Sequence, residues 1–93
     1  MAQPTRAHLI VSGRVQGVCF RLETQKAAKT FGVLGWVRNK RDGTVETVAE
    51  GDEPDVTSLI NWCRTGPPLS GVQEVVVTWQ EYQGEFDAFS IRY

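Results

Sequence analysis

The order in which strand and helix patterns alternate restricts the fold of this chain more than any other feature of its sequence. Apolar and β-branched runs predict strands over residues 6–14, 34–40, 44–50, 72–82 and 89–93. Helical spacing of apolar residues runs from Phe20 to Phe31 and resumes after Pro54. Gly32 and Gly66 follow these two segments and are suited to end them. The predicted order is therefore β-α-β-β-α-β with a short final strand.

This order predicts an α+β fold of the ferredoxin-like, split βαβ kind, with an antiparallel or mixed sheet and two helices on one face. Asp42-Gly43 is a strong hairpin signal and joins the second predicted strand to the third. The first two strands then run parallel, with the third between them. The loop after the first strand and the end of the second strand open on the same edge of the sheet, so we expect Arg21 and Asn39 to face each other there.

Length and charge narrow the class of protein. The 93 residues predict a single domain, residues 1–93, with residues 1–5 as a flexible tail. A net charge of −1 argues against broad binding to nucleic acid or to a membrane surface. The sequence has no apolar leader and no run of transmembrane length, which favours a cytoplasmic protein. Nothing in the sequence requires more than a monomer.

The stretch from Gly13 to Arg21, GRVQGVCFR, lies at the predicted corner between the first strand and the first helix. The first N–H groups of a helix have no intrahelical acceptor, and the helix dipole is positive there. Gly13 and Gly17 permit a tight turn that brings the backbone close to a ligand. With Arg21 in the first helical turn, the corner suits an anion such as phosphate or sulfate.

Several nucleophile chemistries fail on spacing. His8 is the sole histidine and lies in a strand with Ser12, so a catalytic triad is a poor fit; a hydrogen-bonded ring is the better interpretation. A cysteine phosphatase of the C-x5-R type would need arginine where the chain has Gln25. Cys19 is therefore interpreted as a packing cysteine, although a thiolate near Arg21 could have a lowered pKa. No G-K-[ST] follows Gly17, which excludes a Walker loop.

Metal and carboxylate chemistry are equally unsupported by the sequence. Two cysteines without C-x-x-C spacing and one histidine do not make a zinc site, and free thiols are expected. The carboxylates of Glu46, Glu50 and Asp52 are interpreted as a solvated strand face and a helix cap. What remains is an anion cradle with an arginine and an amide. From spacing alone, an Arg21 that merely makes a surface ion pair is an equally good interpretation.

Two motifs resemble those of the acylphosphatases. The first is Gly13–Arg21, and the second is GWVRN over Gly35–Asn39, with Gly43, Val45 and Gly51 following at the family's spacing. The ending, residues 89–93, is also similar, so the resemblance covers nearly the whole chain.

The resemblance implies a metal-independent hydrolase without cofactor that splits carboxyl-phosphate anhydrides into carboxylate and inorganic phosphate. It implies that Arg21 binds the phosphoryl oxygens and that Asn39 orients the attacking water. Backbone N–H groups are implied to assist binding along the loop, at Gln16, Gly17, Val18, Cys19, Phe20 and Arg21.

Other functions on the same fold stay open. A related domain heads large carbamoyl-transferring proteins and handles carbamoyl phosphate. RNA-recognition domains stack bases on strand aromatics, and residues 44–51 contain none. A metal carrier would need the missing C-x-x-C pair. A non-enzymatic module that binds a small ligand is harder to exclude, because fold does not decide function.

Overall fold

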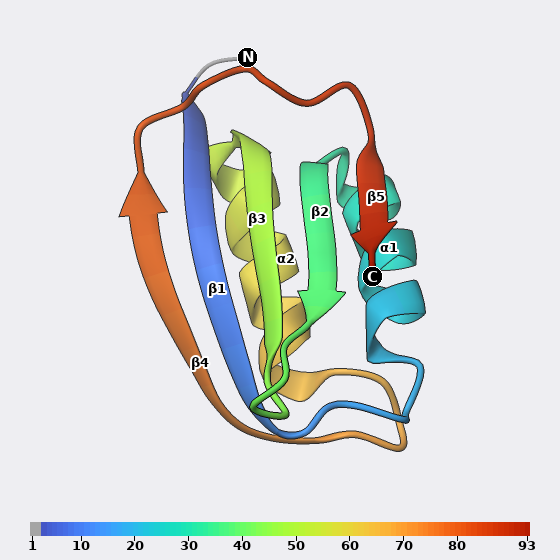
Figure 1. Cartoon of the computed structure of the whole chain (residues 1–93). Helices are drawn as coiled ribbons and strands as arrows, with labels where there is room; N and C mark the ends of the chain where they lie inside the picture. Colours follow the sequence, from blue (N-terminus) through green and yellow to red (C-terminus); the bar gives the residue numbers. More distant parts are fainter. Residues whose placement is uncertain (1–2) are drawn as a thin grey trace.

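The computed structural model describes residues 3–93 and forms one five-stranded sheet with two helices (Figure 1). The elements in chain order are β1 (Pro4–Arg14), α1 (Phe20–Phe31), β2 (Leu34–Asn39), β3 (Val45–Asp52), α2 (Glu53–Thr65), β4 (Gly71–Gln80) and β5 (Phe89–Arg92). The strand order across the sheet is β4-β1-β3-β2-β5. Neighbours are antiparallel except β2 and β5, which run parallel, so the sheet is mixed. The predicted α+β, ferredoxin-like fold is confirmed.

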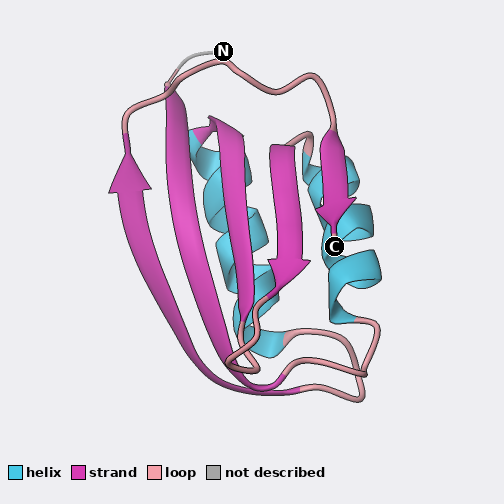
Figure 2. Cartoon of the chain, in the orientation of Figure 1, coloured by secondary structure: helices cyan, strands magenta, loops and turns pink. Residues whose placement is uncertain are grey.

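Both helices cover the same face of the sheet (Figure 2). Alternate residues of β1 point toward them: Ala7, Leu9 and Val11 are fully buried, as expected for a strand with one face on the core. From α2, Val56, Leu59, Ile60 and Cys63 fill the same core at the predicted helical spacing. Gly32 caps α1 in the left-handed conformation with φ of 72°, as its position predicted.

The sheet topology places two distant segments at one edge. β3 pairs with β1 on one side and with β2 on the other, antiparallel to both, so β1 and β2 run parallel as predicted. The β1–α1 loop and the end of β2 consequently meet at the lower edge of the sheet in Figure 1. Asn39 is the last residue of β2, and Arg21 lies in the first turn of α1.

Some predicted boundaries differ from the structure. β1 begins at Pro4, and Pro4 and Thr5 pair with Asp52 and Gly51, so these two residues do not belong to the flexible tail expected over residues 1–5. Met1 and Ala2 lie outside the described residues. β4 ends at Gln80 and not at residue 82. Among residues 3–93, no helix is long and apolar enough to cross a membrane.

The carboxylates interpreted as solvated are mostly enclosed. Glu50 is only 2% exposed and accepts hydrogen bonds from the backbone N–H groups of Gln83 (2.7 Å) and Glu85 (3.3 Å) and from Arg6 (3.3 Å). The segment between β4 and β5 covers this side chain, and no local pattern in the sequence reveals that course. Asp52 does occupy the N-cap of α2, but its side chain makes no capping bond.

Candidate active site

The β1–α1 loop combines buried side chains with an exposed backbone. Val15, Val18 and Phe20 are at most 6% exposed and anchor the loop in the core. Between them, Gly17 and Cys19 are exposed, and both are left-handed, with φ of 74° and 61°. A left-handed conformation is unusual for a residue with a side chain, so Cys19 adopts it as part of the sharp entry into α1. The loop thus turns its backbone, more than its side chains, toward solvent.

The start of α1 leaves backbone donors free. The first intrahelical hydrogen bond runs from the N–H of Glu23 to the carbonyl oxygen of Cys19, at 3.0 Å. Within residues 3–93, the N–H groups of Phe20, Arg21 and Leu22 have no backbone or side-chain acceptor, and no side chain caps the helix. Free donors at the positive end of a helix dipole attract an anion.

Arg21 has no carboxylate partner in the described part of the chain. Its guanidinium lies 4.8 Å from the ring centroid of Tyr93 and donates a long hydrogen bond, 3.4 Å, to the backbone carbonyl of Arg92. The interpretation of Arg21 as a surface ion pair is therefore wrong. Its charge remains available to an anionic ligand.

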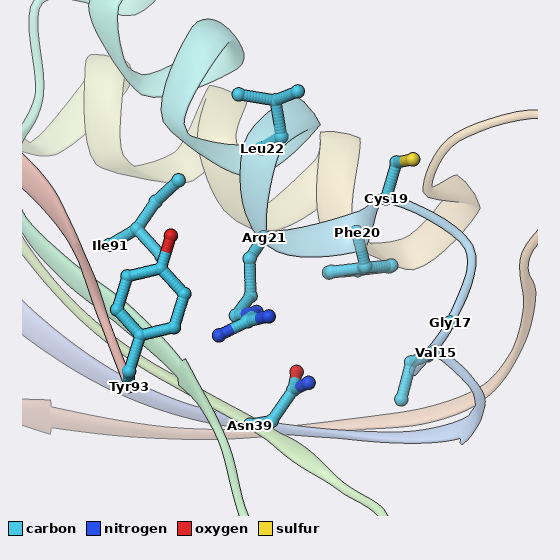
Figure 3. Close-up of a pocket in the computed structure, with 9 residues that line it drawn as sticks. All are labelled: Val15, Gly17, Cys19, Phe20, Arg21, Leu22, Asn39, Ile91 and Tyr93. Carbon is cyan, nitrogen blue, oxygen red and sulfur yellow. The ribbon is translucent and has the colours of Figure 1, made fainter.

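Arg21 and Asn39 line the same hollow, of about 440 Å³. Figure 3 shows the guanidinium of Arg21 pointing toward Asn39 and the ring of Tyr93. Asn39 pairs with Val45 through the backbone, whereas its side-chain amide has no partner among residues 3–93. The wall consists of Val15, Gly17, Cys19, Phe20, Arg21, Leu22, Asn39, Ile91 and Tyr93.

Only some of the predicted loop residues line the hollow. Gly17, Cys19, Phe20 and Arg21 line the hollow, whereas Gln16 and Val18 do not contribute to its wall. Val18 is buried, so only its backbone can serve a ligand. Cys19 is exposed, which corrects its interpretation as a packing cysteine.

Four lining residues are not among those predicted from the sequence: Val15 and Leu22, which flank the predicted loop, and Ile91 and Tyr93 from the C-terminal segment. Ile91 and Tyr93 reach the hollow because β5 pairs parallel with β2, with Ile91 opposite Val37. The strand pattern of residues 89–93 was visible, but nothing in it indicated which edge of the sheet the strand would join.

His8 lies away from this hollow. Its Nε2 is 2.6 Å from Oε2 of Glu46, whose other oxygen accepts a 2.6 Å bond from Nε of Arg38. The expected hydrogen-bonded ring is confirmed. Burial raises the pKa of Glu46, but the bonds from His8 and Arg38 outweigh it and leave this pKa below its usual value. The cluster ties β1, β3 and β2 together.

Comparison with known proteins identifies the family of this chain. A family model described as acylphosphatase matches residues 7–91. The chain belongs to the acylphosphatase family. An acylphosphatase of Pelotomaculum thermopropionicum is 54% identical over 88 residues, which cover 95% of this chain and 96% of that relative. Membership makes the chain a hydrolase that acts on acid anhydrides.

Solved structures of the acylphosphatase fold superpose closely on this chain. The crystal structure of an acylphosphatase from Bacillus subtilis has a TM-score of 0.92 at 39% identity and covers 96% of this chain and 99% of its own. The full-length HypF structure in its phosphate- and nucleotide-bound form matches with a TM-score of 0.85 and 26% identity. That match covers 98% of this chain but 12% of HypF.

Proposed function

We propose that this chain hydrolyses carboxyl-phosphate anhydrides, with the β1–α1 loop and Arg21 holding the phosphoryl group and Asn39 orienting the attacking water. One observation carries the proposal. A guanidinium without a carboxylate partner, free helical N–H groups and an unpartnered amide lie around a single hollow in the described part of the chain.

Binding comes from charge and geometry. The phosphoryl oxygens accept hydrogen bonds from the guanidinium of Arg21 and from the backbone N–H groups of the loop from Gln16 to Arg21. Donors fixed by the fold need not reorganise as charge develops on these oxygens, which is how such groups lower a barrier. Because Val15, Val18 and Phe20 are buried, the loop backbone is anchored to the core.

The chemistry then needs little else. The amide of Asn39 positions a water whose oxygen attacks phosphorus, and the bond between phosphorus and the acyl oxygen breaks. A carboxylate leaves, and since carboxylic acids have a pKa of about 4, its departure needs no protein acid. We propose that the proton of the water passes to a phosphate oxygen of the substrate. This step explains a site without a general base.

The test is release of phosphate from acetyl phosphate and benzoyl phosphate in the presence of a chelator, because no metal or cofactor is part of the proposal. Arg21→Ala and Asn39→Ala should each lower kcat/KM about 10²–10³-fold, the usual cost of one charge-stabilising donor. Arg64→Ala and Asn61→Ala make the same chemical changes at exposed positions of α2 and serve as controls. Near-normal turnover by folded Arg21→Ala or Asn39→Ala would contradict the assignment of roles.

A second candidate is a domain that handles carbamoyl phosphate, as the resemblance to the domain that heads large carbamoyl-transferring proteins implies. Comparing kcat/KM for carbamoyl phosphate and acetyl phosphate separates the two, since a dedicated carbamoyl site should prefer the former at least about tenfold, or about 1.4 kcal/mol. A non-enzymatic module would bind phosphate in calorimetry without releasing it from any acyl phosphate. We also propose that the enzyme is a cytoplasmic monomer, and light scattering of the active protein should then give 10.4 kDa.

A further inference from the structure

The side chain of Gln16 joins the phosphate-binding loop to the β2–β3 hairpin. Its Nε2 donates one hydrogen bond to the backbone carbonyl of Lys40 (2.8 Å) and another to that of Thr44 (2.9 Å). A primary amide has two N–H bonds, so this group uses its whole donor capacity on the hairpin. The sequence suggested a role for the backbone N–H of Gln16 but none for its side chain.

The two carbonyl groups also close the hairpin itself. The N–H of Lys40 donates to the carbonyl of Thr44 at 2.8 Å, and the N–H of Gly43 donates to the carbonyl of Lys40 at 3.2 Å. Gln16 therefore binds the hairpin at a point where its backbone is already fixed. In the described residues, no other side-chain hydrogen bond links the loop of residues 15–19 to this hairpin.

The position of this link matters because Asn39 directly precedes Lys40. Holding the Lys40 carbonyl against the loop also sets the distance from Asn39 to the N–H groups that follow Gly17. Burial of Val15 and Val18 fixes the loop toward the core, but it does not fix the loop toward the hairpin. The hydrogen bonds of the Gln16 side chain hold the loop at a fixed distance from the hairpin.

We infer that Gln16 is a positioning residue that holds the phosphate cradle, meaning the loop N–H groups and the Arg21 guanidinium, and Asn39 at the spacing required for attack by water. The inference rests on the proposed function, in which the cradle sets the place of phosphorus and Asn39 sets the line of the water. Reaction between two groups depends steeply on their alignment, and a misplacement of about 1 Å can cost about 10²-fold in rate.

A matched substitution isolates the link. Gln16→Met keeps the length of the side chain and removes both donors, while the Lys40 and Thr44 carbonyls keep their partners within the hairpin. We expect kcat to fall about 10- to 100-fold. The inhibition constant for inorganic phosphate should change less than threefold, because Arg21 and the helical N–H groups remain. Gln25→Met removes an amide that donates to the Phe89 carbonyl at 3.0 Å and is the control, with an expected change in kcat below twofold.

The deciding experiment is a double-mutant cycle on benzoyl phosphate with Gln16→Met and Asn39→Ala, at enzyme concentrations that keep turnover above spontaneous hydrolysis. If Gln16 acts by placing Asn39, Gln16→Met should lower kcat less than threefold in the Asn39→Ala background. If the two substitutions instead lower kcat independently, so that the double variant loses the product of the two single fold-losses, the inference is overturned. A kcat of Gln16→Met within threefold of the wild type would overturn it as well. A wild type that releases no phosphate would instead refute the proposed function itself.

Folding of each variant is checked by thermal unfolding. If Gln16→Met does not unfold cooperatively like the wild type, the cycle is run with Gln16→Asn, whose amide is one methylene too short to reach both carbonyls. The same outcomes then apply to that variant.

Discussion

The buried carboxylate of Glu50 gives the sharpest prediction about stability. In Glu50→Gln the side chain keeps its size, but one carboxylate oxygen becomes an NH2 donor. In the structure the two oxygens accept from different backbone groups, Oε2 from Gln83 and Oε1 from Glu85, and Oε2 also accepts from Arg6. An amide can satisfy only one of the two positions, so one backbone N–H loses its acceptor.

The size of the effect follows from these contacts. One hydrogen bond is lost, and the others lose the charge that made them about twice as strong, which together cost about 3 kcal/mol. Burying a neutral amide in place of a carboxylate offsets about 1 kcal/mol of this cost. The expected net loss of about 2 kcal/mol lowers Tm by about 8–16 °C in a domain of this size.

Thermal unfolding followed by circular dichroism measures this change, with the exposed Glu81→Gln as the control. The activity of folded Glu50→Gln should stay within twofold of the wild type at 25 °C. Glu50 pairs with Leu34 at the start of β2, whereas Asn39 ends that strand. A Tm within about 2 °C of the wild type would refute this explanation of the role of Glu50.

Three further predictions concern other parts of the molecule. The pKa of Glu46 is lower in the folded protein than its unfolded value of about 4.3, so its carboxylate stabilises the fold above that pH, and the stabilisation is lost as the pH falls through the folded pKa. Between pH 5 and pH 3, the Tm of the wild type should therefore fall more steeply than that of Glu46→Gln. Parallel curves of Tm against pH would contradict this prediction. A disulfide reagent at pH 8 should label exposed Cys19 alone in the native protein, because burial raises the pKa of Cys63 to about 12; two labelled thiols would contradict this. Gly35→Ala places Cβ 1.9 Å from the backbone carbonyl oxygen of Val48 and should lower the free energy of unfolding in urea by about 3 kcal/mol. Gly43→Ala, whose Cβ points into open space, should lower it by about 1 kcal/mol, and equal losses would refute the steric argument.

The fold was predictable because its signals are local. The helical spacing of apolar residues predicted the two helices, and Asp42-Gly43 predicted the hairpin. Asp42 closes this hairpin by accepting hydrogen bonds from the N–H (3.0 Å) and the hydroxyl (2.6 Å) of Thr44. Once β3 lies between β1 and β2, the parallel direction of β1 and β2 follows. The meeting of Arg21 and Asn39 in one hollow was therefore a consequence of topology and needed no knowledge of side-chain packing.

The remaining features depend on contacts between residues distant in sequence. The bond from Gln16 to the hairpin joins residues 24 and 28 positions apart, and the burial of Glu50 depends on a segment more than 30 residues away. Tyr93 reaches the hollow only because β5 joins the edge at β2. Neither residue spacing nor composition reports such contacts.

We propose that the hollow holds a phosphoryl group for attack by water at phosphorus. Hydrolysis of benzoyl phosphate in water enriched in oxygen-18 tests it most directly, because the label marks the atom that water attacks. We expect each turnover to place one labelled oxygen in inorganic phosphate and none in benzoate. Labelled benzoate would show attack at the acyl carbon and would contradict the roles proposed for Arg21, the loop and Asn39.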